Sequence, residues 1–126
     1  MTRILVDTNV LLWLLFGDRG AVSEHAEKAL TDGHNQVSVS AVSVLEIAVK
    51  RSIGKLVIGD AWPLAITALG FDPMPITALH ARQVEQLPWH HRDPFDRLLV
   101  AQASLEDHAL VSADPRMAGY GVEVVW

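Results

Sequence analysis

The stretch Ile4-Leu5-Val6-Asp7-Thr8-Asn9 decides the fold, because three consecutive apolar residues run directly into an acidic residue and then into a helical pattern. A short, unbroken apolar run is typical of a strand that is covered on both faces of a parallel sheet. A second run of this type, over residues 109–112, precedes Asp114. We therefore expect Asp7 and Asp114 to emerge at the same edge of one sheet.

Strand and helix patterns alternate along the rest of the chain. Strands are predicted over residues 4–6, 36–39, 71–76, 109–112 and 123–125, and helices over 8–16, 24–32, 40–53, 61–69, 77–87 and 94–107. In the helix over 40–53, an apolar face made of Val42, Leu45, Val49 and Ile53 is expected to pack on the core. The alternation predicts an α/β fold: a single domain over residues 1–126, with a short parallel sheet flanked by helices on both faces.

Composition excludes several classes of protein. The 126 residues are 50% hydrophobic and contain no cysteine, so the chain is not disordered and has neither disulfides nor thiolate zinc sites. The longest apolar run, Val10 to Phe16, is shorter than the roughly 18 residues of a membrane-spanning helix. We expect a cytoplasmic protein without a membrane segment. The net charge of −5 argues against a protein that coats nucleic acid electrostatically.

Four acids are expected to meet at the carboxyl edge of the sheet. Asp7 and Asp114 follow strands, whereas Glu46 and Asp96 lie early in helices, whose N-termini gather at that same edge. Each acid has a simpler explanation as a helix cap, including Asp93 before Pro94 and a capping box of Ser43 with Glu46. Clustered carboxylates, however, repel one another unless a cation neutralises them. Mg²⁺ or Mn²⁺ held by oxygens suggests phosphoryl chemistry.

Other functions remain open at this point. A receiver-like phospho-signalling domain would have similar size and strand-end acids, but position 8 is Thr where a second acid is expected, and the last lysine is Lys55. A binding module without chemistry would use the acids only as caps. A phosphatase with an aspartyl nucleophile is disfavoured because Asn9 stands where a second Asp is expected, and the chain has no glycine-rich phosphate loop.

Three further motifs carry a resemblance to a known family. They are Ser43-Val44-Leu45-Glu46-Ile47-Ala48, His91-Arg92-Asp93-Pro94-Phe95-Asp96-Arg97-Leu98-Leu99, and Leu110-Val111-Ser112-Ala113-Asp114-Pro115-Arg116. Together with Ile4 to Asn9, and in this order, they resemble the PIN-domain ribonucleases, specifically the VapC-type toxins of toxin–antitoxin pairs. The resemblance covers nearly the whole chain and implies a PIN-like nuclease domain over residues 1–126.

The resemblance also implies roles for individual residues. Asp7 and Asp96 would be the main metal ligands, Glu46 would assist as ligand or water orienter, and Asp114 would complete the shell of a second ion. Thr8, Asn9, Ser112 and Asp93 would orient these carboxylates. The family further implies an endonuclease for cellular RNA of the tRNA or rRNA class, dependent on Mg²⁺ or Mn²⁺, with a homodimeric state and a VapB-type antitoxin as partner.

Basic and aromatic residues are candidates for RNA or protein contacts. Lys50, Arg51 and Lys55 form either a solvated helix end or a lip that binds phosphate. Arg97 and Arg116 neighbour the proposed ligands and either orient them or contact RNA, as an arginine fork suits both roles. A zinc site at His90-His91 is disfavoured, because adjacent residues rarely present both imidazoles to one ion. Trp13 and Trp62 are candidates for dimer or antitoxin contacts.

Overall fold

A computed structural model describes residues 2–126 and shows one five-stranded sheet in which every pairing is parallel. The strands lie in the order β3-β2-β1-β4-β5. Their bounds are β1 Arg3–Val6, β2 Gln36–Ser40, β3 Asp72–Met74, β4 Ala109–Val111 and β5 Val124–Val125. The α/β prediction is confirmed. The strand order also differs from the 2-1-3-4-5 order of receiver domains, which removes that alternative.

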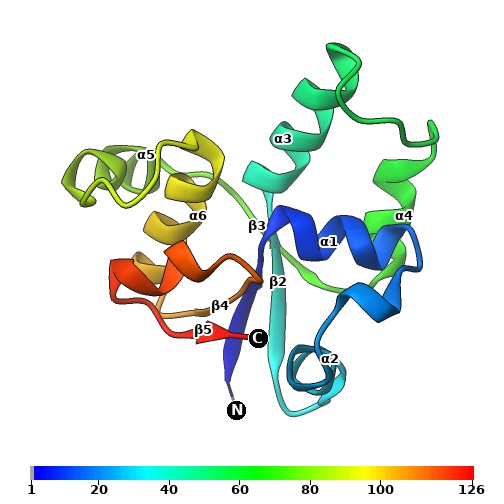
Figure 1. The fold of residues 1–126 in the computed structure, drawn as a ribbon, viewed down its shortest axis with the longest axis horizontal. Helices are drawn as coiled ribbons and strands as arrows, with labels where there is room; N and C mark the ends of the chain where they lie inside the picture. Colours follow the sequence, from blue (N-terminus) through cyan, green and yellow to red (C-terminus); the bar gives the residue numbers. More distant parts are fainter. Residues whose placement is uncertain (1) are drawn as a thin grey trace.

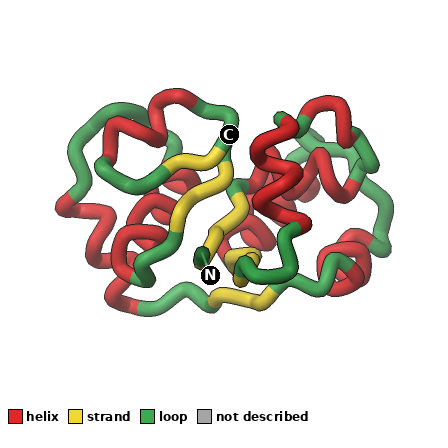
Figure 2. Tube along the Cα trace, turned by 90° about the horizontal axis from the view of Figure 1, so that it is seen from below, coloured by secondary structure: helices red, strands yellow, loops and turns green. Residues whose placement is uncertain are grey.

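Helices cover both faces of the sheet (Figures 1 and 2). They are α1 Thr8–Leu15, α2 Glu24–Thr31, α3 Ala41–Ser52, α4 Trp62–Ala68, α5 Ala78–Gln83 and α6 Pro94–Leu105, with short 3-10 turns η1 Arg19–Ala21, η2 Val84–Gln86 and η3 Pro115–Tyr120. All six predicted helices are present. The helix predicted over 77–87 instead divides into α5 and η2, ahead of Pro88.

The alternation of side chains in β1 builds two cores. Ile4 and Val6 face one core with residues of α1, α2 and α4, whereas Leu5 faces the other with residues of α6 and η3. The proline-containing segment 71–76 contributes β3, which lies at the edge of the sheet next to β2, where a strand tolerates proline.

Most of the apolar face predicted to pack α3 on the core is exposed to solvent. Val42 is fully buried, but Leu45, Val49 and Ile53 are 47%, 38% and 59% exposed. The prediction was wrong for these three residues, because the helix turns Ser43, Glu46 and Ile47 inward instead. Ser40, not Ser43, caps this helix by accepting from the Val42 N–H, so the capping box of Ser43 and Glu46 is absent as well.

Candidate active site

The order in which successive strands are added to the sheet reverses between β1 and β4, and the acids lie at the carboxyl ends of these two strands. β1 leads to β2 on one side, and β4 returns to pair with β1 on the other. Such a switch between neighbouring parallel strands opens a crevice at their carboxyl ends. Asp7 follows β1 directly and Asp114 lies three residues after β4.

Three of the acids cap helices, as the simpler explanation predicted. Asp7 Oδ1 accepts from the Val10 N–H at 2.9 Å, Asp93 Oδ1 from the Phe95 and Asp96 N–H groups at 2.9 and 3.3 Å, and Asp114 Oδ1 from the Arg116 N–H at 2.9 Å. Capping fixes the orientation of these carboxylates. It does not account for Glu46 and Asp96, which cap nothing.

Glu46 is the most unusual of the acids. Its side chain is 4% exposed, and Oε2 accepts from Lys50 Nζ at 2.6 Å, one helical turn along α3. The other oxygen, Oε1, is buried and has no hydrogen-bond partner in residues 2–126. A buried carboxylate oxygen without a donor is costly unless a cation or water satisfies it.

The acids lie close enough to affect one another's protonation. Burial raises the pKa of Asp7 to about 6, and the charges of Glu46 and Asp114 add to the increase, while the Ser112 hydroxyl and the Val10 N–H oppose it. Burial also raises the pKa of Asp96 to about 7, followed by the charges of Asp93, Asp7, Glu46 and Asp114. The charges of Asp7, Glu46, Asp96 and Asp114 thus act on one another at this edge of the sheet.

Two basic residues flank the cluster. The Glu46 carboxylate holds the pKa of the Lys50 ammonium above its usual range, and Arg116 lowers the pKa of Asp114 by a two-pronged contact. In that contact Arg116 Nη2 lies 2.8 Å from Oδ2, and Nε lies 3.1 Å from Oδ1. Both cations offset only part of the negative charge, so the donor set suits an added divalent ion.

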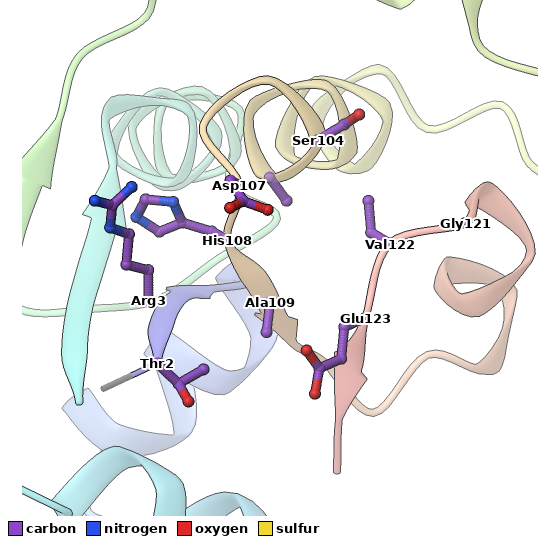
Figure 3. A pocket seen from close by; sticks show the side chains of 10 residues that line it. Thr2, Arg3, Ser104, Asp107, His108, Ala109, Gly121, Val122 and Glu123 are labelled. Carbon is purple, nitrogen blue, oxygen red and sulfur yellow. The ribbon is translucent and has the colours of Figure 1, made fainter. Parts of the chain in front are cut away.

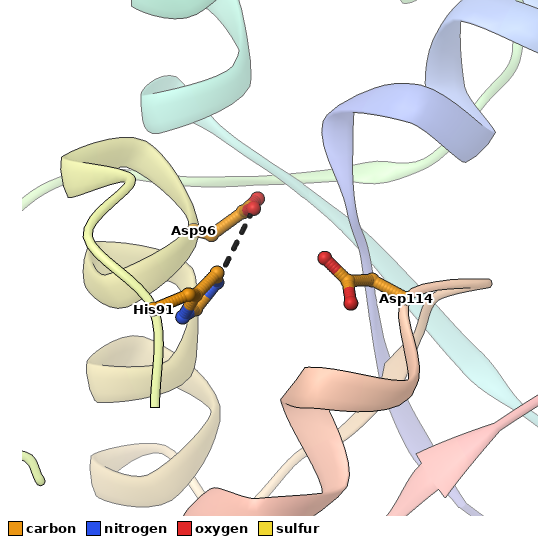
Figure 4. Close-up of side chains that lie close together, drawn as sticks. All are labelled: His91, Asp96 and Asp114. Carbon is orange, nitrogen blue, oxygen red and sulfur yellow. Dashed lines mark ion pairs between the residues drawn. The ribbon is translucent and has the colours of Figure 1, made fainter. Parts of the chain in front are cut away.

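His91, which was disfavoured as a zinc ligand from the sequence, lies beside the acids in the structure. Its Nε2 lies 3.4 Å from Asp96 Oδ2, and one ligand atom each from His91, Asp96 and Asp114 lie within 4.8 Å of one another. Figure 4 shows these three side chains converging, with His91 and Asp96 at the start of α6 and Asp114 opposite them after β4. Position in the motif could have suggested His91, but the sequence carries no information on which way its ring points.

Of the residues expected to orient the carboxylates, some contact an acid in the structure and others do not. The Ser112 hydroxyl accepts from the Asp114 N–H at 3.1 Å and also lowers the pKa of Asp7. Thr8 Oγ1 instead pairs with Ser43 Oγ at 2.9 Å, which joins α1 to α3 rather than touching an acid. Asn9 is exposed on the first turn of α1.

Arg97, expected either to orient the acids or to contact RNA, is instead buried among backbone carbonyl oxygens. The residue is 2% exposed, and its guanidinium donates to the carbonyl oxygens of Val84, Leu87 and Pro88. Of the other basic candidates, Arg51 forms an ion pair with Asp60, whereas Lys55 is exposed to solvent. Lys50 and Arg116 remain candidates for RNA contacts, because each is partly exposed beside the acids.

Among the cavities in the described residues, two that lie away from the acids are relevant here. One, of about 580 Å³, is an apolar groove that we call the α3–α4 groove, lined by Val39, Ala41, Val44, Trp62, Pro63, Ile66, Thr67, Pro73, Met74 and Pro75. The other, of about 550 Å³, lies near the amino ends of β1 and β4, between Arg3, Asp107 and Glu123 (Figure 3). It is thus at the opposite end of the sheet from Asp7.

A family model described as the PIN domain matches residues 4–123. The chain belongs to the PIN-domain family. No curated protein matches it in sequence. Among solved structures, the PIN-domain chain is similar to one in VapBC2 from Rickettsia felis bound to a promoter DNA fragment, with 12% identity, a TM-score of 0.69, and coverage of 98% of this chain and 97% of that one.

Two further structures share the fold. A DNA-bound VapBC from Salmonella typhimurium is 13% identical, with a TM-score of 0.67 and coverage of 98% and 97% of the two chains. FitAcB from Neisseria gonorrhoeae is 19% identical, with a TM-score of 0.62 and coverage of 96% and 95%. At these identities, the likenesses establish the PIN fold. Within residues 2–126, no helix has the length and apolar character that a membrane crossing requires.

Proposed function

We propose that this PIN-domain chain is the toxin of a toxin–antitoxin pair and hydrolyses cellular RNA endonucleolytically, with Mg²⁺ or Mn²⁺ as cofactor. The observation that carries the proposal is the packing of Asp7, Glu46, Asp96 and Asp114 at the carboxyl edge, with raised pKa values at Asp7 and Asp96. Capping alone gives no reason for the unpartnered oxygen of Glu46.

These four carboxylates would hold the divalent cation. When bound, the ion supplies a water of lowered pKa and offsets negative charge on the phosphodiester. Asp7 and Asp96 would be its main ligands, and Glu46 would offer Oε1 while Lys50 holds Oε2. Arg116 holds Asp114 in place and adds positive charge at the exposed rim, where an RNA backbone would approach.

Cleavage of RNA by the purified protein tests this proposal. Asp96→Asn is expected to lower the cleavage rate by about a hundredfold or more, as loss of a group that stabilises transition-state charge does. EDTA should have a similar effect that added Mn²⁺ reverses. The rate is measured on total tRNA and rRNA, with sequencing of the new 5′ ends to locate the cut.

Asp107→Asn is the matched control for that experiment. Asp107 is exposed, lies at the opposite end of the sheet, and has a φ of 54°, a conformation that Asn accommodates. Its substitution should leave cleavage unchanged. Full activity of pure Asp96→Asn protein, or equal losses in both variants, would contradict the proposed site.

The antitoxin is proposed to occupy the α3–α4 groove. The structures similar in fold are those of VapBC2, VapBC and FitAcB. In this chain the groove is almost wholly apolar, and the adjoining face of α3 leaves Leu45, Val49 and Ile53 exposed. Contiguous exposed apolar surface marks a protein interaction site. An apolar segment of the partner fits this surface, and a basic side chain beyond it would suit the acids.

Val44→Arg is expected to separate toxicity from neutralisation. Val44 lines the groove at 38% exposure, so an arginine there would obstruct an apolar segment without touching the acids. Growth arrest should persist, while co-expression of the cognate antitoxin no longer relieves it. Leu79→Arg, at a 64% exposed site on α5, should still be neutralised. Neutralisation of Val44→Arg at the normal level would place the partner elsewhere.

A homodimer also remains a prediction. Trp62 lines the α3–α4 groove, as expected of a contact residue for a partner. Trp13, the other aromatic candidate, packs on Trp126 with ring centroids 5.8 Å apart, so part of its surface is already covered within the chain.

A further inference from the structure

His91 is held in the acid cluster by a residue that lies far from it in the sequence. His91 precedes α6 and its side chain is 2% exposed. Its Nδ1 lies 2.6 Å from the Tyr120 hydroxyl, and its backbone N–H donates to the same oxygen at 3.2 Å. Tyr120 ends η3, the turn that Asp114 caps. One short element therefore supplies both an acid of the cluster and the group that orients the imidazole.

This orientation directs the second ring nitrogen toward the acids. Nε2 is buried and has no hydrogen-bond partner in the described residues. Its 3.4 Å approach to Asp96 Oδ2 lacks the geometry of a hydrogen bond. With Nδ1–H donating to Tyr120, the hydroxyl proton can go to the His91 carbonyl oxygen at 3.5 Å, which leaves the Nε2 lone pair free. A ligating histidine characteristically has its other nitrogen bound in this way.

The resulting donor set differs from a purely carboxylate site. Mg²⁺ binds oxygen ligands and keeps several waters, whereas an imidazole nitrogen favours ions of the first transition row. His91, Asp96 and Asp114 offer one nitrogen and two carboxylates within the span of one ion. Glu46 Oε1 adds a second unpartnered buried atom in the same cluster.

We propose that His91 is a nitrogen ligand of the divalent cation held by Asp96 and Asp114, and that it makes this part of the site prefer a first-row transition ion to Mg²⁺. The inference rests on the proposed function for the presence of a cation. It adds a ligand that the four acids do not include, and it assigns Tyr120 as the residue that positions the imidazole.

Pulsed electron paramagnetic resonance of the protein loaded with Mn²⁺ tests the ligand directly. The wild-type spectrum should show coupling between Mn²⁺ and a ¹⁴N nucleus of an imidazole. His91→Gln should abolish the coupling and weaken Mn²⁺ binding by at least about tenfold in calorimetry, with Mg²⁺ binding changed by less than about twofold. Absence of ¹⁴N coupling in the wild type overturns the proposal, whatever the stability of the variant.

His90→Gln is the matched control, because His90 is exposed and its ring packs edge-on against Tyr120 with centroids 4.8 Å apart. The nitrogen coupling should survive in this variant. Coupling that is lost in His90→Gln and kept in His91→Gln would overturn the assignment. The outcomes are separable from RNA cleavage: a nitrogen-coupled Mn²⁺ in a protein that cuts no RNA would contradict the proposed function and leave the ligand assignment standing.

Discussion

Asp7→Asn is expected to stabilise the metal-free protein at pH 8 while abolishing RNA cleavage. Burial raises the pKa of Asp7 from 3.8 to about 6, so its ionised form is unfavourable in the folded state. The asparagine oxygen can still accept the Val10 N–H, and Asn caps helices as well as Asp does. Removing the charge should then raise the free energy of unfolding by on the order of 2 kcal/mol. Cleavage is lost because the amide oxygen carries no charge for the cation.

The pH dependence of this gain follows from the direction of the shift. An unfolded Asp loses its proton near its ordinary pKa, whereas folded Asp7 retains its proton up to about pH 6. The penalty of ionisation is therefore complete above the folded pKa and disappears as the pH falls toward 4. Metal affinity should also weaken as the pH falls, first through about 7, where Asp96 takes up a proton, and then through about 6, where Asp7 does.

Thermal unfolding of metal-free wild type and Asp7→Asn at pH 8 and pH 5 measures both effects. The variant should melt several degrees higher at pH 8, and the difference should be smaller at pH 5. Asp18→Asn, at an exposed acid that makes no side-chain cap, should change neither value. A lower melting temperature for Asp7→Asn at pH 8 would mean that the carboxylate is mainly structural.

The acid cluster could be predicted because its information is local. Apolar runs over 4–6 and 109–112 define buried strands, and the residues after them must lie at the carboxyl edge of a parallel sheet. The two explanations offered for these acids, helix capping and a shared metal site, are compatible with each other. Asp7 and Asp114 cap their helices with one oxygen and still lie in the cluster. A cap therefore does not argue against a site.

The apolar face of α3 was mispredicted because periodicity identifies a face but not its partner. Val42, Leu45, Val49 and Ile53 repeat at helical spacing, yet only Val42 reaches the core. A surface awaiting a second protein has the same pattern as a surface buried within its own domain. Only the placement of α3 against its neighbours distinguishes the two.

His91 was missed because its role depends on a distant residue. Tyr120, 29 positions later, fixes the imidazole through a turn that the sequence did not reveal. The environment of Arg97 could not be predicted either, because it also depends on a distant part of the chain. The spacing places Arg97 one residue after Asp96, but only the path of the preceding segment decides whether that side chain reaches solvent.

Arg97 anchors the segment that carries His91. Its Nη1 donates to the Pro88 carbonyl at 2.7 Å, and its Nη2 donates to those of Val84 and Leu87 at 3.1 and 3.2 Å. The Trp89 ring packs over the guanidinium at 3.9 Å from its centroid. The long connection from α5 to α6 is thus fastened to α6 by one side chain.

Arg97→Met is therefore expected to lower the free energy of unfolding by about 3 kcal/mol. Replacing a whole buried ion pair with apolar residues is often harmless, because both charges are removed together. Here the partners are backbone carbonyls, which remain when the arginine is gone and lose their donors. Urea denaturation gives the free energy, and hydrogen exchange at the amides of residues 84–91 should accelerate well before global unfolding.

Arg92→Met provides the comparison, because Arg92 is exposed in the same segment. Its free energy of unfolding should stay within about 0.5 kcal/mol of wild type, as for ordinary surface substitutions. If Arg97→Met were as stable as the wild type, water would have to donate hydrogen bonds to the three carbonyls, and Arg97 would not be needed to hold the segment.

If instead the segment loosens, Mn²⁺ bound to Arg97→Met should lose its nitrogen coupling although His91 is still present. That result would connect the buried arginine to the metal site through the position of one imidazole.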